Sequence, residues 1–368
     1  MNNIGLYIHI PFCIGKCAYC SFFSRSAGEP EYDIYTDKLI ESIGYWAARV
    51  NRAVDTVYFG GGTPSLLGHD RLTKILNSVQ NCFSVTDDAE ITVEVNPSST
   101  SDLDFRALRK AGFNRLSIGL QSFDENELRI LGRIHNSKDA EITVSSAKEA
   151  GFDNISLDVM LAVPKQTFES LDRTLEFCAA CRVQHISSYI LKVEEGTPFY
   201  SMRDKLELYN DDEQAAFYEH SIKKLAELGY KQYEISNFCI KGYESRHNLH
   251  YWHDEEYLGI GPSAHSFLDG KRFYYDGSFE SFYQNEIISE SDGGDIEEYI
   301  MLALRLSEGL VFSGLKERFN CQVSDKFVSA AKQLEKNGLC VVTDDSISLT
   351  VKGFLVSNSV IAYLIDNL

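Results

Sequence analysis

Three cysteines that could bind a metal stand close together near the N-terminus: Cys13, Cys17 and Cys20, in the stretch CIGKCAYC. A closed structural zinc site takes four nitrogen or sulfur ligands, and no fourth cysteine lies nearby, although His9 precedes the first one. Three thiolates on a cubane of four irons would instead leave one iron without a protein ligand. The spacing therefore favours an open iron–sulfur cluster over a zinc site.

The order Cys-x-x-x-Cys-x-Tyr-Cys resembles the signature of the radical S-adenosylmethionine superfamily. In that chemistry the open iron chelates the amino and carboxylate groups of S-adenosylmethionine, and an electron from the reduced cluster cleaves the carbon–sulfur bond to a 5′-deoxyadenosyl radical. The resemblance implies that Cys13, Cys17 and Cys20 hold a [4Fe–4S] cluster. It also implies that Tyr19 packs beside the adenine or the cluster.

A glycine triplet, Gly60 to Gly62 in YFGGGTPSLL, follows the second apolar run and would let the backbone approach a ligand closely. It is not a phosphate loop, because no Gly-Lys-Ser or Gly-Lys-Thr follows at the required spacing. A tight turn would explain it as well. The form Gly-Gly-Gly-Thr-Pro resembles one branch of the superfamily, the coproporphyrinogen dehydrogenase-like proteins, with Thr63 where other branches usually carry an acidic residue.

The resemblance to that branch continues in order along the chain, through YIHIPFC, EVNP, GLQSF, LGRIHN, LDVMLAVPKQT and GIGPSAHSF. Any one polar residue in these motifs could be a helix cap or a surface ion pair, but their ordered recurrence favours a shared site. By their match to the motifs, the residues expected to line an S-adenosylmethionine pocket are Tyr7, Gly61, Gly62, Thr63, Glu94, Gln121, Arg133 and Asp158.

Two features divide the branch into decarboxylating enzymes and heme chaperones. The oxygen-independent coproporphyrinogen III dehydrogenase carries a further cysteine two residues after the third cluster ligand, where this chain has Phe22. That enzyme also has a long N-terminal extension, whereas the first predicted strand here begins within a few residues of Met1. We therefore expect a heme chaperone, with radical oxidative decarboxylation of propionates as the alternative. Whether S-adenosylmethionine is turned over stays open.

The stretch HNLHYW, His247 to Trp252, resembles a motif of those heme chaperones. An imidazole can ligate heme iron while aromatic rings flank a porphyrin, so His247 is the candidate heme ligand. An ordinary structural histidine in an aromatic cluster is the alternative. A zinc site built from His247, His250 and His253 is a third, less favoured interpretation.

Short apolar runs alternate with stretches of helical period over the first two hundred residues, which predicts a parallel sheet with right-handed crossovers. Six such units are too few for a closed eight-stranded barrel, so we expect an α/β fold built on a partial (βα)6 barrel. The expected strands are Leu6 to Ile10, Thr56 to Phe59, Ile91 to Val95, Arg115 to Leu120, Ile155 to Val163 and Ile186 to Val193, and the expected helices include Tyr35 to Val50 and Ser101 to Ala111.

The pattern changes from about Glu207, with a helix over Asp211 to Leu228 and a final segment of helix, two short strands and helix that resembles a winged helix. We therefore predict a barrel domain over residues 1–205 and an α+β domain over residues 206–368 that covers the barrel mouth. Cys178 and Cys181 fall inside a predicted helix and are expected to be core packing rather than a redox pair.

The amino-acid composition limits the classes of partner that we expect the protein to bind. The formal net charge of −19 disfavours a mainly electrostatic nucleic-acid binder, and with it an RNA-modifying radical enzyme. No apolar run reaches the length of a membrane helix and no signal peptide is apparent, so we expect a cytoplasmic protein, with a peripheral membrane contact left open. The resemblance implies heme or a porphyrin as ligand and heme-requiring respiratory proteins as acceptors.

Overall fold

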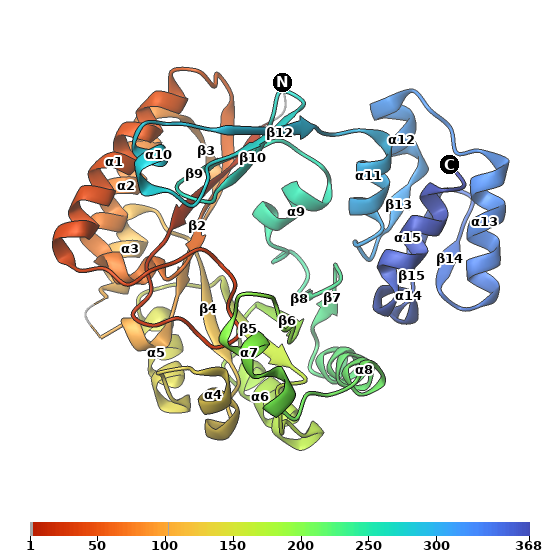
Figure 1. Ribbon diagram of the computed structural model, residues 1–368, viewed down its shortest axis with the longest axis horizontal. Coiled ribbons are helices and arrows are strands. Elements are labelled where there is room, and N and C mark those ends of the chain that lie inside the picture. The colour runs from red at the N-terminus through yellow and green to blue at the C-terminus, as the bar shows by residue number, and fades with distance from the viewer. Residues whose placement is uncertain (1–2, 102) are drawn as a thin grey trace.

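The computed structural model describes residues 3–101 and 103–368. The larger part of the chain forms a curved α/β barrel, and a smaller α+β domain packs beside it (Figure 1). Within the described residues, no helix is long and apolar enough to cross a membrane.

Six parallel strands form the barrel wall, and each pairs with the next in chain order, so the predicted partial barrel is confirmed. Residues alternate between the two faces: Val57 and Phe59 are fully buried under the outer helices, while Tyr58 between them lines the interior. The six strands are β1 (Ile4–Ile10), β2 (Ala53–Gly61), β3 (Ser84–Val95), β4 (Arg115–Gln121), β5 (Ile155–Leu161) and β6 (His185–Ile190).

Helices cover the outside of this wall, as Figure 1 shows for the red-to-green part of the chain. Several begin at side-chain caps, such as Asn136 with Asp139, and Thr167 with Ser170, which form reciprocal capping boxes. The outer helices are α1 (Glu29–Ala47), α2 (Gly68–Cys82), α3 (Phe105–Ala111), α4 (Glu125–Leu131), α5 (Ser137–Glu149), α6 (Phe168–Ala180) and α8 (Asp211–Glu227), with short 3-10 turns at Pro64–Leu67, Pro97–Ser99 and Arg203–Lys205. A further short helix, α7 (Pro198–Met202), lies against the cysteine loop, where Phe199 N donates to Ala18 O.

The helix predicted over Ser101 to Ala111 is shorter than expected. It begins at Phe105, because the Asp104 side chain accepts hydrogen bonds from the next two backbone N–H groups and so caps the helix there. Asp102, within the predicted range, lies outside the described residues.

The sheet extends beyond the six predicted strands at both edges. Its order is β12-β11-β10-β9-β1-β2-β3-β4-β5-β6-β8-β7, with β9 parallel to β1 and β8 antiparallel to β6. The predicted domain boundary at residues 205 and 206 stays a prediction. The added strands are β7 (Lys231–Gln232), β8 (Asn237–Cys239), β9 (Tyr257–Ile260), β10 (His265–Leu268), β11 (Lys271–Tyr274) and β12 (Ile288–Asp292), with α10 (Phe279–Tyr283) before the last.

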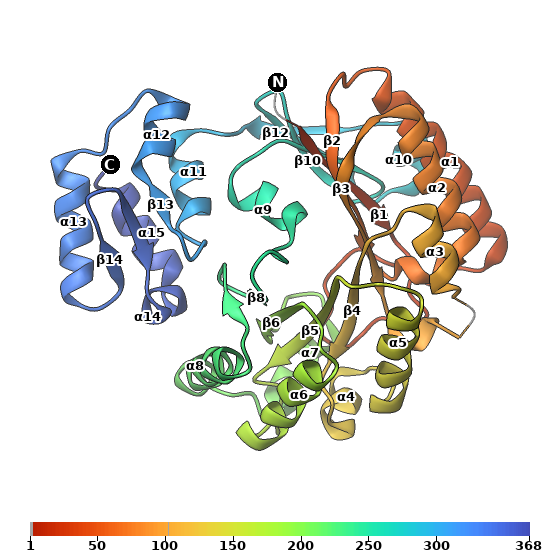
Figure 2. The same cartoon turned by 180° about the vertical axis from the view of Figure 1, so that it is seen from behind.

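A short helix, α9 (Arg246–Trp252), contacts β1 and β2 on one side and α11 (Ile296–Ala303) of the C-terminal domain on the other. Figures 1 and 2 both place it between the barrel and that domain. The motif HNLHYW therefore sits where the two parts of the molecule meet.

The C-terminal domain ends as the sequence predicts, in a helix, two antiparallel strands and further helix. A backbone bridge between Glu234 and Leu306 joins it to the barrel sheet. Its elements are α11 (Ile296–Ala303), β13 (Leu310–Val311), α12 (Phe312–Phe319), α13 (Asp325–Lys336), β14 (Cys340–Val342), β15 (Ser346–Leu349), α14 (Val351–Leu355) and α15 (Ser357–Ile365).

Candidate functional site

A cavity of about 930 Å³ opens at the carboxyl ends of the barrel strands, the edge at which such sheets place their sites. The loop after β1 carries Cys13, Cys17 and Cys20 into its wall. Backbone hydrogen bonds hold this loop: Cys13 N donates to Arg25 O at 3.0 Å, and Ala18 N donates to Leu131 O at 3.1 Å. The three cysteines are thus presented to one cavity from an anchored loop.

The polar neighbours of the cysteines are few. Thr63 Oγ1 lies 3.5 Å from Cys13 Sγ, and Arg133 Nη1 donates to Cys17 Sγ at 3.5 Å. Burial raises the pKa of the Cys20 thiol. All nine cysteines are free, so none of the three is used in a disulfide. The three thiols are therefore free to bind a metal, and one cation, Arg133, stands beside Cys17.

The residues present fit an open iron–sulfur cluster. The three cysteines share a cavity large enough for a second ligand beside them, and the cation next to Cys17 has a buried Nε without a hydrogen-bond partner. In the part of the chain that the structure describes, no three His, Cys, Asp or Glu side chains gather as ligands of a single metal ion. A cubane with one open corner matches this donor set.

The glycine-rich turn after β2 needs its glycines. Gly61 has φ +115°, and a Cβ there would lie 2.5 Å from the His9 ring. Its N–H donates to Glu94 Oε2 at 3.2 Å. Gly62 and Thr63 follow in the cavity wall, where a Cβ on Gly62 would lie 2.6 Å from Phe12 O. The triplet thus packs the turn against the loop that carries the cysteines.

Two carboxyl groups project inward from neighbouring parts of the barrel. Tyr58 Oη donates to Glu94 Oε1 at 2.9 Å, and Ser117 Oγ donates to Asp158 Oδ1 at 3.3 Å. Burial, and then the nearby Asp158, raise the pKa of Glu94 to about 7. Burial also raises the pKa of Asp158. The cavity therefore holds two carboxyl groups that favour the protonated form more than exposed acids do.

Arg133 and Gln121 complete the polar wall near the cysteines. Arg133 Nη2 donates to Gly119 O at 2.7 Å, and the buried Nε of the same side chain has no hydrogen-bond partner. Gln121, at the end of β4, has φ +66°, a left-handed conformation that is uncommon for a residue with a side chain. Strain of this kind is often found where a fold positions a functional group.

The structure brings together nearly all the residues predicted for the S-adenosylmethionine pocket. Tyr19 lines the cavity, with its ring centroid 6.5 Å from that of Phe199. Tyr7 is the exception: it lies behind the wall, stacked on Tyr58, with its Oη 3.0 Å from His9 Nδ1. The predicted residues in the cavity lining are Tyr19, Gly61, Gly62, Thr63, Glu94, Gln121, Arg133 and Asp158.

His247 lies behind the cavity wall rather than in the cavity lining. It is 1 % exposed, with Nδ1 2.8 Å from Thr56 Oγ1 and Nε2 2.8 Å from Tyr251 Oη. Burial lowers the pKa of His247 to about 3, so its ring is neutral at physiological pH. Tyr251 does line the cavity, and it therefore stands between His247 and the open space.

The other two histidines of the motif region have separate partners. His250 Nε2 lies 2.8 Å from Asp55 Oδ1 and its Nδ1 lies 2.8 Å from Glu255 Oε2, while His253 pairs with Glu308. Despite burial, hydrogen bonds to Asp55 and Glu255 raise the pKa of His250 to about 9. The three histidines do not converge on one point.

The pairing of His250 predicts an alkaline loss of stability. Its folded-state pKa, about 9, lies above the unfolded value of about 6.5, so its contribution is complete below pH 6.5 and disappears as pH rises through 9. We expect about 3 kcal/mol of unfolding free energy to depend on it. Urea unfolding of the wild type and His250→Gln at pH 6 and pH 10 measures this. The difference in unfolding free energy between the two proteins is compared at the two pH values, because the contributions of other titrating groups cancel in that difference. Equal differences at both pH values would contradict it.

Arg115 and Glu234 also line the cavity and were not predicted as site residues. A signal for Arg115 exists in NRLSIGLQ, where Arg115, Ser117, Gly119 and Gln121 stand at every second position of one strand. Such alternation marks one face of a strand. Glu234 lies in a turn whose position depends on long-range pairing, and the sequence gives no comparable signal.

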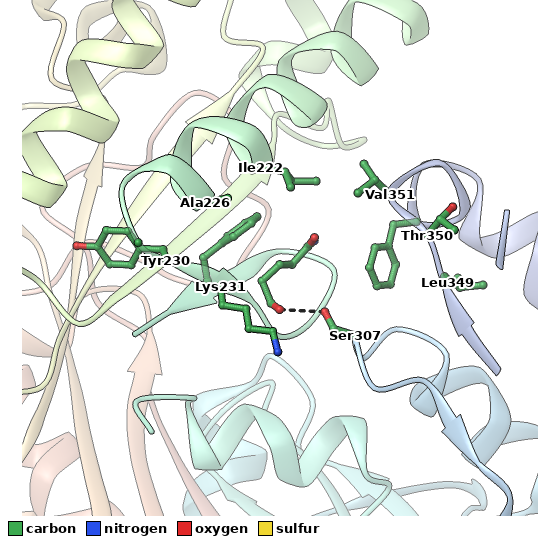
Figure 3. A pocket seen from close by; sticks show the side chains of 12 residues that line it. Ile222, Ala226, Tyr230, Lys231, Ser307, Leu349, Thr350 and Val351 are labelled. Atoms are coloured by element: carbon green, nitrogen blue, oxygen red, sulfur yellow. Dashed lines mark hydrogen bonds between the residues drawn. The ribbon is translucent and has the colours of Figure 1, made fainter. Parts of the chain in front are cut away.

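A second cavity, of about 520 Å³, lies between the barrel edge and the C-terminal domain and contains no predicted site residue. Figure 3 shows apolar side chains from both sides facing it, including Ile222 and Ala226 of α8 and Val351 of α14. Ser307 Oγ donates to Gln232 O at 3.1 Å across one side. Its lining carries no acid, thiol or imidazole, so we assign it no chemistry.

The comparisons agree with this geometry. Residues 7–178 match the radical SAM superfamily and residues 295–356 match the HemN C-terminal domain. A solved structure of coproporphyrinogen III oxidase (HemN) from Escherichia coli superposes with a TM-score of 0.84, covering 100 % of this chain and 91 % of that one at 24 % identity. The fold and the cavity thus define a radical S-adenosylmethionine protein, a class whose members use a [4Fe–4S] cluster and S-adenosylmethionine.

More narrowly, the chain belongs to the HemW family. It is 33 % identical to the heme chaperone HemW of Bacillus subtilis over 98 % of this chain and 99 % of that protein. It is 38 % identical to the heme chaperone HemW of Escherichia coli over 73 % of this chain and 72 % of that protein.

Proposed function

We propose that this protein is a heme chaperone that holds a [4Fe–4S] cluster on Cys13, Cys17 and Cys20, binds S-adenosylmethionine beside it, and carries heme to heme-requiring respiratory proteins. The observation that carries the proposal is the single cavity that is lined both by the three cysteines and by Tyr251 and Trp252 of the HNLHYW motif. The names of the relatives support heme as the cargo.

The cavity residues divide into groups suited to the two ends of S-adenosylmethionine. Arg133, beside Cys17, suits its carboxylate, and Glu94 suits an N–H of its amino group. Asp158 and Gln121 suit ribose hydroxyls. When bound, the cluster would supply an electron to the sulfonium, and the chain's residues would orient the molecule and exclude water from it.

We expect Glu94→Gln to weaken S-adenosylmethionine binding by about tenfold, because it removes the charged acceptor that would bind an N–H of the amino group. Since the pKa of Glu94 is raised to about 7, wild-type affinity should increase as pH rises through 7, and that increase should be lost in the variant. Isothermal titration of the reconstituted protein from pH 6 to 8 measures both effects.

Glu194→Gln is the matched control, because Glu194 is an exposed acid in the lining of the same cavity. It should bind S-adenosylmethionine as the wild type does. An unchanged affinity and pH profile in Glu94→Gln would remove Glu94 from the proposed site.

Heme would occupy the same cavity, whose volume of about 930 Å³ suits a ligand of this class. Tyr58, Tyr251 and Trp252 offer aromatic faces there. We propose His247 as the iron ligand. Its neutral ring is the ligating form, and Tyr251 must release Nε2 before the iron can bind it.

Anaerobic heme titration with visible spectroscopy tests this function. We expect saturable binding by the wild type and loss of the histidine-ligated spectrum in His247→Ala. His253→Ala, which changes an exposed pair with Glu308, is the control and should keep that spectrum. The absence of saturable heme binding by the wild type would contradict the proposed function itself.

A further inference from the structure

Arg115 is a buried cation in the cavity wall without a hydrogen-bonding partner. It is 2 % exposed and lines the cavity at the start of β4. Its guanidinium makes no hydrogen bond to any residue that the structure describes, and its buried Nε is unpartnered. Only Glu90 among the described acids comes within ion-pair range, with Oε2 4.0 Å from Nε.

Glu90 is already used elsewhere. Its Oε1 accepts a hydrogen bond from His247 N at 3.1 Å, and its Oε2 accepts one from Arg246 N at 3.2 Å. Both bonds satisfy the first turn of α9, which has no other partner for those N–H groups within the helix. Glu90 therefore anchors α9 and does not match the planar fork of Arg115.

The other charged neighbours are likewise engaged. Asp158 accepts from Ser117, and Glu94 accepts from Tyr58 and from Gly61 N. The other titratable groups near Arg115 include His185 and His247, whose pKa values are lowered by burial, the Cys239 thiol, whose pKa is raised by burial, and the phenols of Tyr58 and Tyr233. No nearby protein group supplies the paired acceptor oxygens that a buried guanidinium requires.

We propose that Arg115 anchors a carboxylate of the ligand that enters the cavity. A guanidinium presents two parallel N–H donors that fit a carboxylate bidentately. The inference rests on the proposed function, since heme carries two propionate carboxylates. It assigns an orientation: one propionate points inward to Arg115 at the start of β4, rather than outward to solvent.

S-adenosylmethionine also carries a carboxylate, but a second cation already serves it. Arg133 stands beside Cys17, where the methionyl group must lie if it chelates the cluster. Arg115 lies on the same strand face as Ser117 and Gly119, at the opposite end of β4 from Gln121. Arg115 therefore lies at the end of the cavity that is opposite the carboxyl ends of the strands.

The ligand itself provides the first test. We expect wild-type protein to bind heme roughly tenfold or more tightly than heme dimethyl ester, whose propionates cannot pair with a cation. Anaerobic titrations with both compounds measure the ratio. Equal affinities would overturn the role of Arg115 while leaving heme binding intact. Failure to bind either compound would overturn the proposed function, and the inference with it.

Variants then locate the effect. Arg115→Gln should abolish the preference for heme over its dimethyl ester, and Arg115→Lys should retain part of it, because a lysine keeps the charge without the fork. Lys192→Gln, which changes an exposed cation of the same cavity, should keep the full preference. A full preference in a folded Arg115→Gln, checked by thermal unfolding, would refute the assignment.

Titration of Arg115→Gln with S-adenosylmethionine separates the two sources of a carboxylate. A large loss of S-adenosylmethionine affinity, with the heme preference unchanged, would place the methionyl carboxylate at Arg115 and overturn the proposed orientation of heme. Loss of the heme preference together with a retained S-adenosylmethionine site supports it.

Discussion

Cys17→Ala should leave the protein without its iron–sulfur cluster. After anaerobic reconstitution we expect no more than roughly a tenth of the wild-type iron and sulfide per chain, and loss of the broad visible absorbance. With Cys17 gone, only two thiolates remain in the cavity wall, and Arg133 loses the sulfur to which it donates. Iron and sulfide analysis with visible spectra measures this.

Cys82→Ala is the matched control, because Cys82 is an exposed free cysteine at the end of α2, and it should reconstitute like the wild type. A complete cluster in Cys17→Ala would contradict the ligand assignment. If the wild type instead bound one zinc per chain and no iron, the result would support the alternative of a structural zinc site.

Asp254→Ala should destabilise the protein at the junction of the two domains. The Asp254 side chain is 0 % exposed; Arg318 Nη2 of α12 lies 2.6 Å from Oδ2 and Arg272 Nη2 of β11 lies 3.3 Å from Oδ1. Burial raises the pKa of Asp254 to about 6, and its two arginines are partly exposed, so the variant chiefly loses the hydrogen bonds to Arg318 and Arg272, which typically costs about 1–3 kcal/mol. Chemical unfolding at neutral pH measures the change.

Asp269→Ala is matched in two respects. Asp269 also pairs with an arginine, Arg52, but its side chain is 78 % exposed, where an ion pair contributes below about 1 kcal/mol. Both aspartates have left-handed backbones, with φ +53° at Asp254 and +51° at Asp269, so the strain that alanine adds is common to both. Equal losses in the two variants would mean that the buried network does not hold the junction.

Much of the barrel could be predicted from the sequence, because each βα unit is local. The apolar run around Val57 is followed by a glycine turn and then a helix, and that order alone requires a parallel neighbour. The cysteine loop could also be predicted, since the spacing of its ligands lies within one short stretch. The shared cavity then follows from the strand ends, because all parallel strands deliver their loops to one edge.

The rest depends on contacts between distant segments. The pairing of β9 with β1 joins Tyr257 to Gly5, which lie on adjacent strands but far apart in the sequence, and no local pattern encodes it. The burial of His247 depends on the same pairing, because α9 packs beneath β1 and β2. The motif predicts Tyr7 in the cavity lining, whereas the register of β1 stacks it behind Tyr58.

The most direct test asks what the protein does with a tetrapyrrole. Reduced, cluster-loaded protein would be incubated anaerobically with S-adenosylmethionine and coproporphyrinogen III, and in parallel with heme, followed by chromatography and mass spectrometry of all tetrapyrroles. The account predicts bound heme recovered unchanged and coproporphyrinogen III without decarboxylation. Formation of protoporphyrinogen, with loss of two carboxyl groups as carbon dioxide, would contradict it.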